Sequence, residues 1–221
     1  MYNLFKKIIN FLLSILSPPF CEACRIFLEQ RTILCKNCVQ KIRPVAVHDL
    51  RVTAKSKIPV YAIGAYQEPL KSLVLAKMRS DRLMSLYLSE QMYARTPFSN
   101  LPCDFLVPVP LYFTRIWRRG YNQSLVMANK LQQLRPEIRV ADILKRIRAT
   151  KYQSNLGKLA RVDNLKNAFS LKKIDYELYR DKNLILIDDV FTSGATLAAA
   201  SKELLKLKPK SIAIVVCARA I

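Results

Sequence analysis

Residues 184–196, with the sequence LILIDDVFTSGAT, constrain the fold of this chain more than any other stretch. They begin with an unbroken apolar run at 184–187, which is typical of a strand buried on both faces of a parallel sheet. Asp188 and Asp189 follow, where we expect the strand to end. A small, hydroxyl-rich turn then leads into a helical pattern at 197–207. The stretch therefore predicts a strand, a tight turn and a helix amino terminus in direct succession.

The turn after the two acids has the composition of an oxyanion site. Backbone N–H groups at a strand-to-helix turn form a nest that attracts phosphate, and the helix amino terminus adds partial positive charge. Two carboxylates would repel a bare phosphate, but beside a sugar phosphate they can accept hydrogen bonds from vicinal ribose hydroxyls. An ordinary turn with two surface acids is the alternative. The expected phosphate contacts are Thr192, Ser193, Gly194, Ala195 and Thr196.

This stretch resembles the phosphoribosyl pyrophosphate (PRPP) signature of type I phosphoribosyltransferases at every class position. The resemblance implies an α/β fold with a mainly parallel sheet flanked by helices, and a ribose held by Asp188 and Asp189 as the catalytic pair. It also implies magnesium bound together with PRPP, where the ion bridges pyrophosphate and ribose oxygens. Such an enzyme transfers a phosphoribosyl group and releases pyrophosphate, so stabilising that leaving group matters more than a strong base.

A proline-rich motif precedes the helix that we expect at 125–134. Residues 104–111, DFLVPVPL, predict a strand that ends in a loop. Pro108 and Pro110 fix the backbone there and donate no hydrogen bond to a ladder. A rigid loop at the carboxyl end of a strand is where open α/β sheets bind ligands.

Arginines follow this loop and suit a bidentate grip on phosphate. Trp117 and Tyr121 alternate with them, as aromatic residues do in platforms that bind single-stranded nucleic acid. A solvated basic turn with a core tryptophan is the alternative. The arginines expected to contact substrate are Arg115, Arg118 and Arg119.

The wider chain is similar to the ComF-type competence proteins, which are phosphoribosyltransferase-like proteins with an N-terminal four-cysteine zinc module. The similarity rests on VPVPL, on RRGYNQS, on R-x-T-x-x-Q-x-x-L at 148–156, and on the R-x-x-N and Ala-Phe that follow. It covers 18–219, although Ser80 and Asn167 replace glycines of the family pattern. It implies a role in DNA uptake, with single-stranded DNA and other uptake proteins, such as a helicase or a recombination mediator, as partners. It also implies a cytoplasmic setting, at the inner face of the membrane where DNA enters.

The balance of charge points to an anionic partner. The 221-residue chain has a formal net charge of +21, which attracts nucleic acid, anionic lipid or polyphosphate substrates. A generally basic proteome is the alternative. Residues 150–159 are polar and predict a mobile loop, and in the type I family a loop of this region closes over PRPP. The residues expected to bind nucleic acid are Arg118, Arg119, Tyr121, Arg146, Arg148, Lys151, Lys158 and Arg161.

Two C-x-x-C pairs near the amino terminus predict a structural zinc site. Four thiolates fill the tetrahedral shell of zinc and leave no open position for chemistry. Redox pairs or disulfides are the alternative, which a chain with no export signal makes less favourable. Cys103 and Cys217 lie in apolar contexts and are expected to be core thiols. The expected metal ligands are Cys21, Cys24, Cys35 and Cys38.

The division that we expect is an amphipathic helix at 1–17, a zinc-binding module at 18–45 and a phosphoribosyltransferase-like domain at 46–221. The amino-terminal helix is too short in its apolar runs to span a bilayer, so it either packs on the protein or contacts a membrane surface or a partner. Within the domain we expect an irregular basic linker that holds a surface-exposed His48. The linker is expected at 44–57, strands at 60–66, 143–147 and 210–217, and one or two helices at 70–94.

Three functions are compatible with these motifs. The first is a PRPP-dependent transferase that acts in DNA uptake. The second is a catalytically inactive, single-strand-binding accessory of the uptake machinery that uses the PRPP pocket as a sensor. The third, a general salvage enzyme, fits the zinc module and the basic charge poorly. No residue set in the sequence identifies an acceptor.

Overall fold

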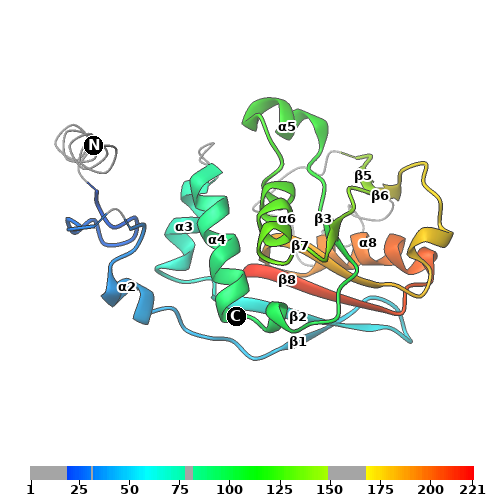
Figure 1. The fold of residues 1–221 in the computed structure, drawn as a ribbon, viewed down its shortest axis with the longest axis horizontal. Coiled ribbons are helices and arrows are strands. Elements are labelled where there is room, and N and C mark those ends of the chain that lie inside the picture. Colours follow the sequence, from blue (N-terminus) through cyan, green and yellow to red (C-terminus); the bar gives the residue numbers. More distant parts are fainter. Residues whose placement is uncertain (1–18, 31, 78–81, 149–167) are drawn as a thin grey trace.

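The computed structural model describes residues 19–30, 32–77, 82–148 and 168–221, and its centre is a six-stranded sheet (Figure 1). The strand order is β1-β2-β8-β7-β3-β4, and every neighbouring pair is parallel except β1 with β2. A mainly parallel sheet flanked by helices confirms the predicted fold class. The strands are β1 (His48–Arg51), β2 (Lys57–Ala65), β3 (Phe105–Pro108), β4 (Arg139–Val140), β7 (Asn183–Phe191) and β8 (Ser211–Arg219), beside a separate antiparallel pair of β5 (Leu144–Arg146) and β6 (Phe169–Leu171).

Helices cover both faces of the sheet. On one face, side chains of α3, α4 and α6 form a cluster with Ile185 and Ile187 of β7. On the other face, α8 packs with Leu184 and Leu186. The unbroken apolar run of β7 therefore alternates between two buried layers, which is the reason that the sequence shows no polar residue within it. The helices are α2 (Lys36–Gln40), α3 (Leu70–Lys77), α4 (Arg82–Arg95), α5 (Phe113–Arg119), α6 (Gln123–Leu134) and α8 (Ala195–Leu204), with short 3-10 helices η1 (Pro97–Ser99), η2 (Glu177–Tyr179) and η3 (Leu205–Leu207).

β7 is longer than its apolar run. We expected the strand to end before the two acids, but its ladder with β8 continues through Asp188, which pairs with Val216, to Phe191, which pairs with Arg219. The expectation was wrong because β8 supplies a partner for the whole length. The two aspartates therefore belong to a strand held by β8 and not to a free loop.

The expected linker at 44–57 contains β1, so that part of the prediction was also wrong. β1 pairs antiparallel with β2, from His48 opposite Val60 to Arg51 opposite Lys57. Only Leu50 of this short strand is buried, so the segment shows little of the alternation by which a strand is recognised. His48 is exposed, as expected, and its ring packs edge-on against Phe191, with the centroids 5.1 Å apart.

The four-cysteine segment packs against the helical face of the sheet that holds α3 and α4. Its buried residues, including Leu34 and Ile42, belong to the same apolar cluster as Leu70 and Leu73. The connection to the sheet is close, because the N–H of Ala65 donates to the Arg43 carbonyl at 3.0 Å. The predicted helix at 1–17 lies outside the described residues. None of the helices in the described ranges combines the length and apolar character that crossing a membrane requires.

We expect Gly64→Ala to destabilise the fold by about 2 kcal/mol, as overpacking commonly does. A Cβ at Gly64 would lie 2.5 Å from the Arg43 carbonyl oxygen and 3.1 Å from Leu70 Cδ1, so the segment that joins the cysteines to the sheet would have to move. Urea unfolding measures the change. Gly120→Ala is the matched control, because a Cβ there meets nothing within 4 Å and only the positive φ of 78° opposes it. An unchanged midpoint for Gly64→Ala would show that this close contact does not exist.

Candidate functional site

The two motifs singled out from the sequence meet at one edge of the sheet. β3 and β7 are parallel neighbours, with Pro108 opposite Ile187, so their carboxyl ends lie together. The N–H of Val109 donates to the Ile187 carbonyl at 3.0 Å, which fixes the proline loop beside the start of the aspartate pair. This edge of an open parallel sheet is the usual place for a ligand.

The turn after β7 requires glycine for two separate reasons. Gly194 has φ +73°, a left-handed conformation that L side chains rarely adopt. A Cβ there would also lie 2.8 Å from Leu50 Cδ1 and 2.9 Å from the Phe191 ring. The chain must therefore turn tightly against β1 before α8 begins at Ala195.

The turn contains backbone N–H groups that take part in no hydrogen bond among the described residues. Thr192 and Ser193 are exposed, and Thr196 is half-buried in the first turn of α8. Among the described residues, no hydrogen bond is donated by the N–H groups of Thr192, Ser193 or Gly194. Such groups at a helix amino terminus are suited to a phosphate. The geometry of the predicted phosphate loop is therefore compatible with the role that the sequence suggested.

Asp188 is held by a relay of polar contacts that the sequence did not predict. Asn122 caps α6 by accepting from the Ser124 N–H at 3.1 Å, and its amide nitrogen donates to the Val109 carbonyl at 3.1 Å. The Ser124 hydroxyl then donates to Asp188 Oδ1 at 3.1 Å. One motif, RRGYNQS, thus ties the proline loop to α6 and α6 to the first aspartate. The asparagine and the serine were visible in that motif, but their partners are remote in sequence.

Arg146 lies within electrostatic reach of Arg115 and Asp188. Burial first, and then the charge of Arg115, lowers the pKa of Arg146, while the Asp188 carboxylate opposes that change. The Arg146 guanidinium also lies over the Phe169 ring, 5.4 Å from its centroid. Arginines from β5 and α5 are therefore brought together with the first aspartate of β7.

The remaining sequence candidates fall in different places. Arg119 is half-buried near the end of α5, which also contains Arg118, and Arg148 is exposed beyond β5. Tyr121 is buried at 8% exposure, with the Arg82 guanidinium 5.2 Å from its ring centroid, so its face is not open to a stacked base. Lys151, Lys158 and Arg161 lie outside the described residues.

Trp117 is 91% exposed, so the core tryptophan considered as an alternative is not found. Cys217 is fully buried, as expected, and its sulfur lies 3.5 Å from that of Met127. Cys103 is only half-buried, and burial raises its pKa to about 12. This makes Cys103 a poor nucleophile near neutral pH.

A cavity of about 520 Å³ adjoins the turn at Gly194. Ser193, Gly194 and Ala195 line one end of it, and the rest is formed by β1, by Ala168 and Phe169, and by the outward side of α8. Neither aspartate of the pair is among its lining residues. The lining of this cavity therefore includes the turn at Gly194 but not the aspartate pair.

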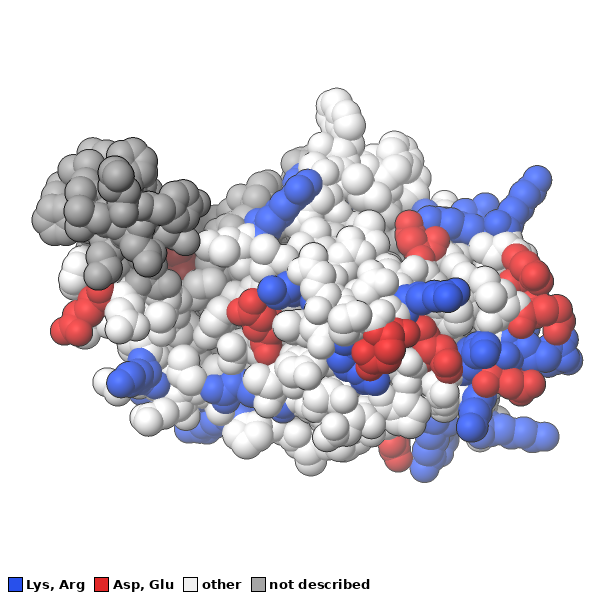
Figure 2. All heavy atoms as spheres, viewed as in Figure 1, with Lys and Arg blue, Asp and Glu red and all other residues white. Residues whose placement is uncertain are grey.

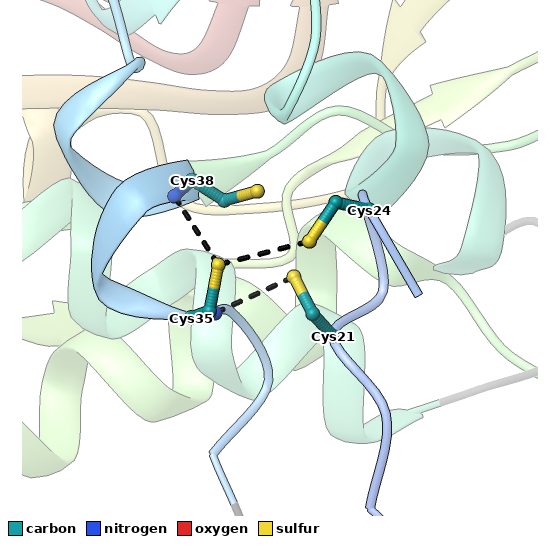
Figure 3. Close-up of side chains that lie close together, drawn as sticks. All are labelled: Cys21, Cys24, Cys35 and Cys38. Carbon is teal, nitrogen blue, oxygen red and sulfur yellow. Dashed lines mark hydrogen bonds between the residues drawn. The ribbon is translucent and has the colours of Figure 1, made fainter. Parts of the chain in front are cut away.

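The four predicted metal ligands come together. Their sulfur atoms all lie within 4.8 Å of one another, and Figure 3 shows them turned toward a common point. The Cys24 and Cys35 sulfurs are 3.7 Å apart, which agrees with the separation of about 3.8 Å between thiolates bound to one tetrahedral zinc at 2.3 Å. The donor set and its geometry therefore fit a structural zinc ion. The residues of the cluster are Cys21, Cys24, Cys35 and Cys38.

Backbone donors favour a thiolate in this cluster. The Cys35 N–H donates to the Cys21 sulfur, and the Cys38 N–H donates to the Cys35 sulfur, each at 3.4 Å. Burial acts to raise the pKa of Cys21, but the backbone N–H groups outweigh it and hold the value at about 6. Burial and the neighbouring sulfurs raise the pKa of Cys38. Four thiolates this close repel one another, so a bound dication would stabilise all of them together.

Comparisons with known proteins agree with this geometry. Residues 106–221 match the model of the phosphoribosyl transferase domain family. The chain is 35% identical to competence protein F of Haemophilus influenzae over 211 residues, which is 92% of this chain and 86% of that protein. It is 31% identical to the DNA utilization protein YhgH of Salmonella typhimurium over 198 residues, and 31% identical to YhgH of Escherichia coli K12 over 193 residues. Each of these two matches covers 84% of this chain. They cover 84% of the Salmonella protein and 78% of the Escherichia coli protein.

We expect the purified protein to contain one zinc ion per chain and to lose it in Cys38→Ser. Because the cluster shares its core with α3 and α4, loss of the ion should speed amide hydrogen exchange first at 19–43 and then at the contacting helices. Metal analysis and hydrogen-exchange mass spectrometry measure both effects. Cys103→Ser is the matched control, since it removes a thiol outside the cluster and should retain the metal. Equal metal content in the two variants would contradict the site.

Proposed function

Because this chain belongs to the phosphoribosyltransferase family, in the group related to competence protein F, we propose that it acts in DNA uptake and binds PRPP together with magnesium. Its setting would be the cytoplasm, at the inner face of the membrane, where single-stranded DNA and other uptake proteins are its partners. The observation that carries the PRPP proposal is the turn at Gly194. It is a left-handed glycine turn with uncommitted N–H donors, placed directly after two aspartates of a fixed strand.

The ribose assignment rests on the position of Asp188. Its Oδ1 accepts from Ser124 at the carboxyl edge of the sheet, and this carboxylate with that of the neighbouring Asp189 would accept hydrogen bonds from the vicinal hydroxyls of a pentose. The turn would hold the phosphate of the same sugar. A sugar phosphate satisfies both groups, whereas a bare phosphate would be attracted by the turn and repelled by the acids.

The leaving pyrophosphate would lie toward the arginines. Arg146 and Arg115 are close enough for each charge to affect the other, and arginine stays protonated despite the lowered pKa. Two guanidinium groups near one carboxylate leave a net positive charge, which a bound polyanion would neutralise. Magnesium, when bound, would supply further positive charge between the pyrophosphate and ribose oxygens, with few protein ligands of its own.

Zinc at the cysteine cluster would be structural. All four ligand positions are thiolates, so no coordination site remains for a substrate. The cluster is part of the core that supports α3 and α4. We propose that it stabilises this side of the protein and takes no part in the transfer.

If the protein transfers the phosphoribosyl group, the molecule that receives it is not identified by any residue of the site. A catalytically inactive accessory that binds single-stranded DNA and uses the PRPP pocket as a sensor would need the same turn and the same aspartates. Release of pyrophosphate in the presence of free bases, of nucleotides and of single-stranded DNA separates the two functions.

PRPP with magnesium should raise the midpoint of thermal unfolding by roughly 5 to 10 °C at a hundredfold excess over Kd, which corresponds to about 2.7 kcal/mol. Asp188→Asn combined with Asp189→Asn should abolish the shift, because an amide is a weaker acceptor for the ribose hydroxyls. Differential scanning fluorimetry measures it. The matched control is Asp175→Asn with Asp181→Asn, which removes two acids from exposed positions before β7, at the opposite edge of the sheet. If both double variants keep the full shift, the ribose assignment fails.

Affinity for single-stranded DNA should fall steeply as salt is raised, because arginine and lysine contacts to phosphates release condensed counterions. Arg146→Gln with Arg148→Gln should reduce the slope of log K against log salt by up to about 1.4. Fluorescence anisotropy of a labelled oligonucleotide measures the slope. Arg180→Gln with Lys182→Gln, at the opposite edge of the sheet, provides a variant of equal charge that should keep the original slope. A salt-independent affinity would rule out the basic surface as a nucleic-acid site.

A further inference from the structure

Helix α5 carries an exposed aromatic face. Trp117 is 91% exposed and Phe113 is 65% exposed, and their spacing of four residues places them on one side of the helix. Ile116, at 39% exposure, extends the same surface, and the Tyr112 ring packs against Phe113 with centroids 4.6 Å apart. Large exposed apolar groups that gather in one place usually mark a binding surface.

The aromatic surface of α5, formed by Phe113, Ile116 and Trp117, lies next to the proposed ribose site. α5 ends at the left-handed Gly120, and the chain then runs to Asn122, which caps α6. Two residues further, Ser124 holds Asp188. Figure 1 shows α5 above α6, beyond the end of β3, and Figure 2 shows that the projection at this position is largely uncharged at its tip.

The same helix, α5, carries several positively charged residues. The sequence of α5, FTRIWRR, holds three arginines and no acid. The charge of Arg115 reaches Arg146, which is itself within reach of Asp188. Exposed aromatic rings and arginines on one helix are complementary to a ligand that has apolar rings and a polyanionic backbone.

We propose that Trp117, with Phe113 beside it, stacks on the bases of single-stranded nucleic acid whose phosphates lie along the arginines of α5 and β5. The inference rests on the proposed function for the placement of the PRPP site, and it adds the residues that hold the strand beside that site. A stable protein partner would need about 800 Å² on this side, far more than a seven-residue helix offers. A membrane surface would need a longer apolar face than three side chains provide.

The chain has one tryptophan and ten tyrosines, so fluorescence excited at the long-wavelength edge of the absorption band, where tyrosine does not absorb, reports on Trp117 alone. We expect an oligo(dT) to quench that fluorescence as it binds, because a base stacked on the indole changes its excited state. Inorganic polyphosphate of similar charge, which has no bases, should compete for the arginines without the same quench. Vesicles that contain anionic lipid should produce no blue shift. Salt should weaken the binding of both polyanions.

Trp117→Ala should weaken binding of a labelled oligo(dT) by roughly 5- to 150-fold, the range seen for loss of one base–aromatic stack. Trp117→Phe should retain most of the affinity, and Phe113→Ala should give a smaller loss. Tyr176→Ala is the matched control, since it removes an aromatic residue of 45% exposure next to η2, before β7. Unchanged circular dichroism and zinc content establish that each variant is folded.

Equal affinity of Trp117→Ala and the unaltered protein would overturn the proposal, as would an equal quench by polyphosphate. A blue shift with anionic vesicles, combined with no quench by oligo(dT), would assign α5 to a membrane surface and would also overturn it. The PRPP-induced shift in unfolding temperature is measured on the same variants. If it persists while the stacking tests fail, only the stacking proposal is lost, and if it is absent in the unaltered protein, the proposed PRPP site is lost instead.

Discussion

Burial of the β7 apolar run between two helical layers is the constraint on which the rest of the structure depends. Each side chain at 184–187 is at most 1% exposed, and burying a leucine or isoleucine stabilises a fold by about 1.5–3 kcal/mol. β7 must therefore lie in the middle of the sheet, with β8 and β3 as parallel neighbours. Since its carboxyl end is also the carboxyl end of those neighbours, two aspartates placed after the run are brought to the ligand edge of the sheet.

The turn at Gly194 is held in place partly by β1, a strand that is remote from it in sequence. Leu50 of β1 and the Phe191 ring both lie where a side chain at Gly194 would be. His48, two residues before that leucine, packs edge-on against the same Phe191 ring. The edge strand β1 therefore has a second task beyond pairing with β2, because it limits the positions that the turn can take. A turn held in this way would lose less conformational freedom on binding the proposed phosphate.

Local pattern was enough to predict that a buried strand and a glycine turn occur here, although not that the strand continues through the two acids. The apolar run and the Gly194 turn follow from residue type and order. The cysteine cluster could also be predicted, because each C-x-x-C pair can turn both of its sulfurs toward one point. The short strand β1 could not be found in this way. It has one buried residue, and it exists because the β2 edge offers a ladder partner.

The exposure of the aromatic residues in and beside RRGYNQS could not be predicted from the sequence. Trp117 and Tyr121 are four residues apart and look equivalent, yet one is 91% exposed and the other 8%. The helix ends between them at Gly120, whose left-handed conformation changes the direction of the chain. The helical periodicity that would place both rings on one side is therefore broken. Only the position of α5 on the folded protein decides which ring faces solvent, and Arg82 then covers the other.

The same argument explains why Ser124 escaped prediction while the arginines did not. Guanidinium groups indicate anions wherever they lie, so a cluster of them is informative without a fold. A hydroxyl indicates nothing until its partner is known, and Asp188 is 64 residues away in sequence. The contact matters because it fixes the position of one oxygen of that carboxylate. Arg146 of β5 attracts the Asp188 carboxylate electrostatically, while the Ser124 hydroxyl of α6 donates a hydrogen bond to it. The orientation of the first aspartate is thus set by two elements that neither the signature nor its immediate neighbours contain.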